Sequence, residues 1–333
     1  MKKINTAITG VAAYVPEDKL TNEDLTKMVD TTDEWIYSRV GIKERRILKG
    51  ENLGSSYMGS KAVDLLLEKT GTTTDEVEVI ICATSNPDYR FPATAAVIAD
   101  RSGVKNCFAY DIQAACTGFI VALQIGKAYI NAGLYKKVVV VCAEKMSSMV
   151  NYQDRATCPL FGDAAAAVLL EPTYEDVGVV DTLLHTDGEG IPYLMMKAGG
   201  SAQPITYGAI DRGEHFLYQE GRTVYKYAVS NMIDVYKQIM IRNQLTNDSV
   251  NWFIPHQANA RIIEAVGSRL GIASEKIILN IENFGNTSSA TIPLCIAQWE
   301  DKFKKGDNIL LTAFGAGFTW GSTYIKWAYD AKK

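Results

Sequence analysis

Short, continuous apolar runs alternate with amphipathic segments along most of the chain. Residues 77–85 read VEVIICATS and residues 137–145 read KVVVVCAEK, a pattern typical of parallel strands covered on both faces. Between them, apolar residues recur at steps of three and four from residue 117 to Gly133, which predicts a largely buried helix. The alternation of the two patterns predicts an α/β protein.

The same order of strands and helices recurs in the second half of the chain. Further strands are expected at the N-terminus and at residues 108–112, 164–172, 249–257, 276–286, 308–317 and 322–327. Further helices are expected at residues 20–28, 32–39, 56–69, 94–101, 225–243, 258–270 and 287–303. The repetition predicts two similar α/β halves, residues 1–173 and 174–333, related by a pseudo-two-fold axis.

Three chemically active side chains fall at matching strand ends. Residues 108–112 have the short apolar, aromatic-rich character of a buried strand. Cys116 follows this strand and begins a helix, Asn286 occupies the equivalent corner of the second half, and His256 ends the preceding strand. Because equivalent strand ends of two related halves face a common cleft, we expect these three residues to converge.

Each of these residues also has an ordinary structural interpretation. Free cysteines are mostly small buried hydrophobes, a histidine at a strand end is often only hydrogen-bonded, and asparagine caps helices well. Together, the three residues indicate a catalytic site. A thiol at a helix N-terminus can ionise near neutral pH and carry an acyl group, while a neutral imidazole and an amide can donate to an enolate oxygen. This combination suits carbon–carbon bond formation from thioesters.

Composition and charge exclude several other classes. A net charge of −4, from 34 basic and 38 acidic residues, offers no electrostatic basis for binding nucleic acid. No run of 18 apolar residues occurs, so no membrane span is expected, and the N-terminus is interpreted as a strand rather than a signal peptide. The six cysteines show no CxxC or metal-type spacing, which suits reduced thiols in a cytoplasm. The corner FGAGFTWG lacks the nucleotide-binding spacing, so neither nicotinamide nor metal is implied.

Six ordered blocks resemble the β-ketoacyl-[acyl carrier protein] synthase III family. They are TTDEWIYSRVGI, DIQAACTGF, DRATCPLFGDAAAAVL, IPHQANARI, NFGNTSSATIP and FGAGFTWG. The resemblance implies a thiolase-like fold layered α-β-α-β-α. It also implies a decarboxylative Claisen condensation of a short acyl-CoA with malonyl-acyl carrier protein, which initiates fatty-acid synthesis, with no cofactor besides the coenzyme A thioester as substrate.

The same resemblance implies roles for individual residues. Cys116 would carry the acyl group, His256 and Asn286 would stabilise the enolate, and the backbone N–H groups of Cys116 and Ala316 would form the oxyanion hole. Phe91 would reach across a homodimer to close the partner's acyl pocket. The coenzyme A route would be lined by Thr31, Trp35, Arg39, Arg155, Asn259 and Arg261, and the acyl carrier protein would contact Lys226 and Arg261. Without the resemblance, Trp35 is better interpreted as a half-buried helix residue and the arginines as surface cations.

The primer and the pathway stay open at this point. Gln113 replaces a small apolar residue found in many members, and residues 187–221 have the variable character of a segment that shapes an acyl pocket. Acetyl, branched and longer primers all fit this pattern. The alternatives are a family relative in a specialised polyketide-like or quinolone-like pathway and, less favoured, a non-catalytic acyl-CoA-binding scaffold. Thiolases, hydroxymethylglutaryl-CoA synthases and chalcone-synthase-like enzymes match the motifs less well.

Overall fold

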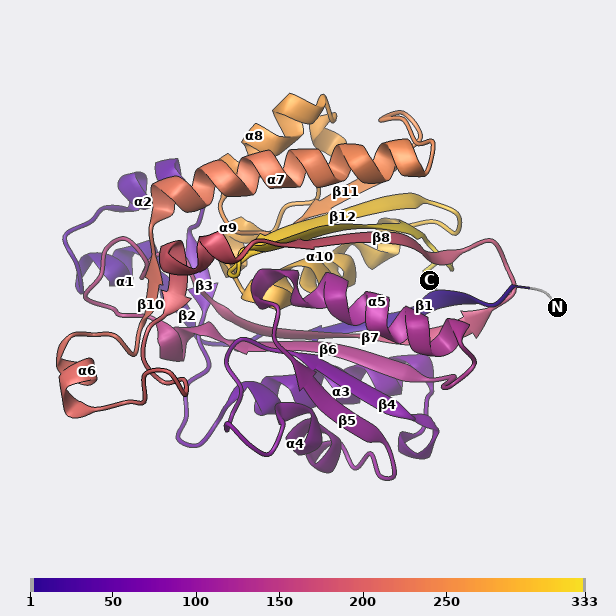
Figure 1. Cartoon of the computed structure of the whole chain (residues 1–333), viewed down its shortest axis with the longest axis horizontal. Helices are drawn as coiled ribbons and strands as arrows, with labels where there is room; N and C mark the ends of the chain where they lie inside the picture. The colour runs from indigo at the N-terminus through magenta and orange to yellow at the C-terminus, as the bar shows by residue number, and fades with distance from the viewer. Residues whose placement is uncertain (1–2, 332–333) are drawn as a thin grey trace.

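Two β-sheets enclose a pair of helices in the computed structural model, which describes residues 3–331 (Figure 1). The first sheet has the order β1 (Asn5–Tyr14), β7 (Asp163–Thr173), β6 (Val138–Lys145), β4 (Val79–Ala83) and β5 (Phe108–Ile112). The second has the order β8 (Gly178–Thr186), β13 (Thr319–Lys326), β12 (Asn308–Gly315) and β11 (Trp252–Pro255). Two small hairpins pair β2 (Lys19–Thr21) with β3 (Glu44–Arg46) and β9 (Leu194–Met196) with β10 (Leu217–Gln219).

The helices form three layers around the sheets. Between the sheets lie α5 (Gly118–Asn131) and α10 (Thr291–Trp299), which contact both of them. The outer faces are covered by α3 (Ser55–Thr70) and α4 (Thr94–Arg101) on one side and by α7 (Gly221–Arg242) and α8 (Ala260–Leu270) on the other. The remaining helices are α1 (Asn22–Thr26), α2 (Asp33–Val40), α6 (Tyr207–Asp211) and α9 (Ile281–Phe284). Figure 1 shows α1, α2 and α6 at the end of the molecule opposite the chain termini.

The pairing directions of the two sheets correspond strand by strand. β7 is antiparallel to both β1 and β6, and β13 is antiparallel to both β8 and β12. The next pairs, β6 with β4 and β12 with β11, are parallel. The predicted architecture of two similar α/β halves is therefore present. The division between residues 173 and 174 stays a prediction; β7 ends at Thr173 and β8 begins at Gly178.

Two predicted strands differ from the structure. The strand expected at 276–286 is reduced to one parallel bridge between Phe253 and Ile277. The side chain of Gln257 replaces a strand neighbour there, because it accepts from the Asn280 N–H at 3.0 Å and donates to the Ile278 carbonyl at 3.2 Å. The chain then turns into α9. The strand β5 was expected to be buried, but it is the edge of its sheet and Phe108 is 51% exposed.

The inner helices are buried as the periodicity predicts. In α5, Phe119 and Leu123 are fully buried, and Gly126 allows close packing on the first sheet, since a Cβ there would lie 2.5 Å from Leu170. Among residues 3–331, no helix has the length and apolar character needed to cross a membrane.

A buried arginine connects the β2–β3 hairpin to the segment before β7. Arg45 is fully buried and donates to the carbonyls of Leu20 at 3.0 Å and Pro159 at 2.7 Å, and to Oδ1 of Asn22 at 2.9 Å. Burial lowers the pKa of its guanidinium to about 10, which leaves it protonated at neutral pH. Neutral oxygens therefore bind the two terminal nitrogens of this buried cation, while its Nε has no hydrogen-bond partner among residues 3–331.

Replacing Arg45 by alanine should destabilise the fold. The change leaves two buried acceptors and one half-buried acceptor without this donor, so we expect a loss of about 3 kcal/mol in the free energy of unfolding, measured in urea. Lys49→Ala is the control, because its pair with Asp18 is exposed and its loss should cost less than about 1 kcal/mol. Equal losses in the two variants would contradict this account of Arg45.

Candidate active site

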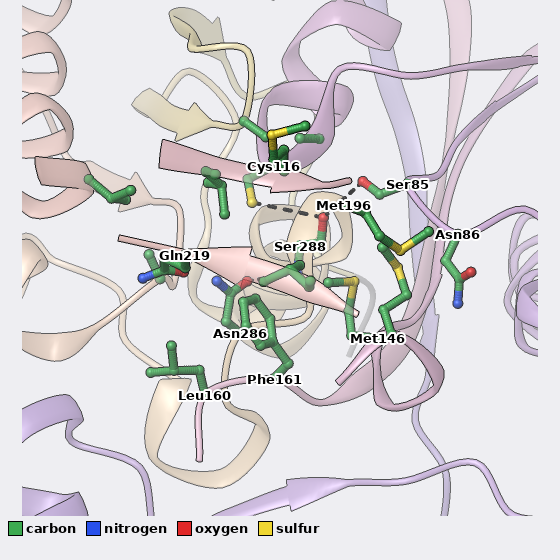
Figure 2. Close-up of a pocket in the computed structure, with 18 of the residues that line it drawn as sticks. Ser85, Asn86, Cys116, Met146, Leu160, Phe161, Met196, Gln219, Asn286 and Ser288 are labelled. Carbon is green, nitrogen blue, oxygen red and sulfur yellow. Dashed lines mark hydrogen bonds between the residues drawn. The ribbon is translucent and has the colours of Figure 1, made fainter. Parts of the chain in front are cut away.

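A cavity of about 1220 Å³ collects residues from both halves of the chain. Cys116, His256 and Asn286 all line it, although they follow three separate elements, β5, β11 and α9. Figure 2 shows the sulfur of Cys116 and the amide of Asn286 directed toward the same space. The structure thus brings together the three side chains that the sequence placed at matching strand ends.

The corner that carries Cys116 is a short 3₁₀ turn, Ala115–Thr117, immediately before α5. Ala115 has a left-handed backbone with φ +45°, a conformation that a non-glycine residue rarely adopts. Gly315, at the end of β12, packs directly against this turn. A Cβ at Gly315 would lie 2.7 Å from the backbone nitrogen of Cys116. The backbone of Cys116 and the segment leading to Ala316, which also lines the cavity, therefore lie side by side.

Cys116 is half-buried, and among residues 3–331 its thiol has one side-chain partner, Ser288, at 3.8 Å between Sγ and Oγ. The pKa of this thiol is raised to about 12, chiefly by burial; the contact with Ser288 acts to lower it and the nearby carboxylate of Glu144 to raise it. The expectation that Cys116 ionises near neutral pH is therefore wrong for the resting protein. Desolvation outweighs the helix terminus.

His256 follows β11 directly and is 1% exposed. Its Nδ1 lies 2.7 Å from the hydroxyl of Thr291, and its backbone N–H donates to the Thr312 carbonyl at 2.8 Å. Burial lowers the pKa of the imidazole to about 3, so the ring is neutral at physiological pH.

Asn286 is held by its backbone and by its amide oxygen. Its N–H donates to the Leu160 carbonyl at 2.8 Å, and its carbonyl accepts from the Gly162 N–H at 3.1 Å. Its Oδ1 accepts from the Ser288 N–H at 2.8 Å, a local contact two residues along the chain. Asn286 is not the helix cap considered from sequence, because Thr287 precedes the following 3₁₀ turn and Ala290 precedes α10. Because Oδ1 is engaged in this way, the amide NH₂ is the group left to donate to a ligand in the cavity.

Five of the residues expected along a coenzyme A route line the cavity: Trp35, Arg39, Arg155, Asn259 and Arg261. The guanidinium carbon of Arg155 lies 4.0 Å from the ring centroid of Trp35, and that of Arg39 lies 4.6 Å away. A purine between two such plates needs about 7 Å, twice a van der Waals contact, so Arg155 must move to admit one. Asn259 also caps α8, accepting from the Arg261 N–H at 2.9 Å.

Three predicted residues within the described range do not line this cavity. Phe91 is 86% exposed, Lys226 lies exposed on α7, and the hydroxyl of Thr31 is buried without a hydrogen-bond partner among residues 3–331. Their proposed roles stay predictions. The segment expected to shape an acyl pocket contributes Met195 and Met196 to the cavity wall.

Sequence reasoning missed the polar residues behind the three central side chains. They are Ser85, Glu144, Ser288 and Thr291. One signal was available: Glu144 is the only charged residue within the apolar run VVVVCAE, and a carboxylate in a covered strand needs dedicated donors. Within residues 3–331, no group of three or more His, Cys, Asp or Glu side chains is arranged to hold a metal ion.

Comparison with known proteins identifies the family. Profiles described as 3-oxoacyl-[acyl-carrier-protein (ACP)] synthase III and as its C-terminal part match residues 110–188 and 240–327. A β-ketoacyl-[acyl-carrier-protein] synthase III of Bacteroides thetaiotaomicron is 58% identical over 333 residues, which cover 100% of this chain and 99% of the relative. The chain belongs to the β-ketoacyl-[acyl carrier protein] synthase III family. A synthase III of Phocaeicola vulgatus is 56% identical over 333 residues, 100% of both chains.

Solved structures agree with this assignment. The 3-oxoacyl-[acyl-carrier-protein] synthase III of Aquifex aeolicus is 38% identical with a TM-score of 0.88, over 97% of this chain and 100% of that one. A priming β-ketosynthase of the R1128 polyketide pathway is 28% identical with a TM-score of 0.90, over 98% and 97% of the two chains. The thiolase-like fold is confirmed. The chain is an acyltransferase of the synthase III family, which carries out the initiating condensation of fatty-acid synthesis.

The neutral state of His256 should make the fold sensitive to acid. Its folded pKa of about 3 lies below the ordinary value of about 6.5, so below pH 6.5 the unfolded chain binds a proton that the folded chain does not. Stability is therefore lost as the pH falls. Between pH 7 and 5.5 we expect the wild type to lose about 1 kcal/mol more than His256→Gln in urea unfolding. Equal losses would mean that the imidazole is not held neutral by burial.

Proposed function

We propose that the chain condenses a short acyl-CoA with malonyl-acyl carrier protein, through an acyl thioester on Cys116. The observation that carries this proposal is the shared cavity, where a thiol, a neutral imidazole and an amide that follow three separate elements face one space. Among the described residues that line this cavity, Cys116 is the only cysteine and His256 the only histidine.

In the first step, the sulfur of Cys116 attacks the acyl-CoA carbonyl and coenzyme A leaves as its thiol. The negative charge on the carbonyl oxygen would be stabilised by the backbone N–H groups of Cys116 and Ala316. The close approach at Gly315 supports this role, because it brings the two backbone segments within reach of one oxygen. Any side chain at position 315 would push the two backbone segments apart.

In the second step, malonyl-acyl carrier protein loses carbon dioxide and the enolate carbon forms a bond to the acyl carbonyl carbon. The C–S bond to Cys116 breaks, which releases a 3-oxoacyl-acyl carrier protein and returns the sulfur to the enzyme. Nε2 of His256 and the amide of Asn286 would donate to the enolate oxygen. This role requires the imidazole proton on Nε2, so the Thr291 hydroxyl would donate to Nδ1 at 2.7 Å in preference to its other acceptor, the Ser288 carbonyl at 3.1 Å. Each donor would lower the activation free energy of this step by about 3–4 kcal/mol.

The substrate carriers would bind where aromatic and basic residues meet at the cavity. Trp35 would stack on the adenine once Arg155 moves, and Arg39 and Arg261 would contact phosphates. Lys226 and Arg261 are exposed cations that suit the acidic carrier protein. Coenzyme A thioesters are substrates in this scheme, and no further cofactor takes part.

A homodimer completes the proposal. The strand β5 has a neighbour on one side only, and Phe108 on it is 51% exposed, which favours pairing with a second copy. Phe91 is 86% exposed, so its ring is available to enter a partner's acyl pocket. We place the enzyme in the cytoplasm, where its six free cysteines would stay reduced.

Acetyl-CoA should label Cys116 alone. Intact-protein mass spectrometry is expected to show one acetyl group on the wild type and none on Cys116→Ala. The control Cys107→Ser should keep the label, because that thiol lies outside the cavity. In His256→Ala the label should form while condensation with malonyl-acyl carrier protein falls at least about 100-fold, since one enolate donor is lost.

Two outcomes would contradict the acyl-enzyme: an unlabelled wild type, or an adduct that persists in Cys116→Ala. A panel of acyl-CoA primers in the same assay would define chain-length and branching preference. Replacing malonyl-acyl carrier protein with other acceptors would separate fatty-acid initiation from a specialised pathway.

Trp35→Ala should weaken acyl-CoA binding and leave the chemistry intact. Loss of stacking and cation–π contacts worth about 1–2 kcal/mol predicts a roughly tenfold rise in KM for acetyl-CoA. The rate at saturating acetyl-CoA should not change. Tyr37→Ala is the control, because Tyr37 lies on the same helix but does not line the cavity. A KM like that of the control would remove Trp35 from the binding site.

A further inference from the structure

Glu144 is a fully buried carboxylate directly behind the cavity, near the end of β6. Its Oε1 accepts from the Ser289 hydroxyl at 2.7 Å, and its Oε2 accepts from the Ser85 N–H at 2.9 Å. Longer contacts of 3.4 Å come from the hydroxyls of Ser85 and Thr84. No lysine, arginine or histidine within residues 3–331 forms an ion pair with it.

A continuous line of hydroxyl groups connects this carboxylate to the nucleophile. The Ser85 hydroxyl lies 3.4 Å from Oε1 of Glu144 and 3.4 Å from the Ser288 hydroxyl, which lies 3.8 Å from the Cys116 sulfur. Figure 2 shows Cys116 and Ser85 both directed at Ser288. Ser288 is held there in a left-handed conformation with φ +51°, which a serine adopts only when its surroundings require it.

The proposed acylation needs a destination for the thiol proton. Cys116 is neutral at rest, whereas the species that attacks a thioester is the thiolate. His256 is a poor acceptor, because burial lowers its pKa and because its Nε2 proton is required for the enolate. Glu144 is a better acceptor than an exposed carboxylate, since burial raises its pKa.

The remaining titratable side chains near Glu144 do not compete for the proton. Cys142 lies two residues from Glu144 on the same face of β6, whereas Cys82 on β4 packs on the other face of the sheet. Burial raises the pKa of each thiol. Both therefore stay protonated and have no role as bases near neutral pH. Among these neighbours, Glu144 is the group able to take up a proton.

We propose that Glu144 accepts the proton of Cys116 through Ser288 and Ser85 during acylation and returns it to coenzyme A. The S–H bond of Cys116 breaks as its proton passes to the Ser288 oxygen, the Ser288 proton passes to Ser85, and the Ser85 proton passes to Glu144. The thiolate forms the C–S bond of the acyl-enzyme, and the C–S bond to coenzyme A breaks. The proton then returns along the same hydroxyls to the departing thiolate. This inference rests on the proposed acyl-Cys116 intermediate.

The proton-acceptor role and a purely electrostatic effect of Glu144 have opposite signs. As a nearby anion, Glu144 raises the pKa of the thiol, so its neutralisation makes Cys116 easier to ionise. As the proton acceptor, it speeds acylation, so its neutralisation makes acylation slower. The two effects can therefore be measured separately in the same variant.

The test compares three variants in two reactions of Cys116. Glu144→Gln keeps the shape of the side chain but cannot take up a proton, Ser288→Ala interrupts the line of hydroxyls, and Ser289→Ala removes a donor to Glu144 outside that line. Single-turnover acetylation by acetyl-CoA is followed by rapid quench and mass spectrometry. Alkylation by iodoacetamide is followed across pH 6–10, because it reports thiol ionisation without a thioester.

We expect Glu144→Gln and Ser288→Ala to slow acetylation about 100-fold, the typical contribution of a positioned proton-transfer group. Iodoacetamide alkylation of Glu144→Gln should be as fast as in the wild type or faster, with its pH midpoint moved downward. Ser289→Ala should slow acetylation far less. Decarboxylation of malonyl-acyl carrier protein, which depends on His256 and Asn286, should be retained in Glu144→Gln.

Acetylation of Glu144→Gln at the wild-type rate would overturn the inference. So would a parallel loss of acetylation and alkylation, because that pattern indicates displacement of Cys116 rather than loss of a proton acceptor. If Glu144→Gln does not fold, Ser288→Ala with wild-type acetylation overturns the inference by itself. A wild type that takes up no acetyl group would instead refute the acyl-enzyme.

Discussion

The site depends on keeping several polar side chains in a space with little water. His256, Glu144 and Asn286 are each less than one-tenth exposed, and the half-buried thiol of Cys116 opens onto the same region. Desolvation makes the imidazole and the thiol neutral, and for the thiol this is the opposite of what the helix N-terminus alone favours. The free-energy cost of burying each polar group is offset by a specific hydrogen-bond donor or acceptor.

This environment results from the contact between the two halves. Serines 288 and 289, which belong to the second half, reach Cys116 and Glu144 of the first half. Gly315 of β12 packs against the Cys116 nitrogen. Neither half alone contains the nucleophile together with its donors. The duplicated architecture therefore does more than build a core: it creates an interface between the halves in which the reactive sulfur lines a cavity.

The cavity wall beyond the central residues is mixed in character. It includes flexible apolar side chains such as Met146 and Met196, and amides such as Asn86 and Gln219 (Figure 2). Methionine adapts its shape to irregular partners, so this wall can accommodate primers of different outline. A change of one methylene in such a pocket alters discrimination by only about 1–3 kcal/mol, which is why primer preference needs direct measurement.

The sequence by itself determined the α/β class and the repeated order of elements, because local periodicity is encoded in neighbouring residues. It also indicated that Cys116, His256 and Asn286 lie at one cleft, from their positions at the ends of expected strands. Only the tertiary structure decided their ionisation and their partners. The pKa of Cys116 depends on burial by distant segments, and the line from Ser288 to Glu144 joins residues 144 positions apart along the chain. Edge position in a sheet is likewise a property of strand order, which explains why β5 was expected to be buried and is not.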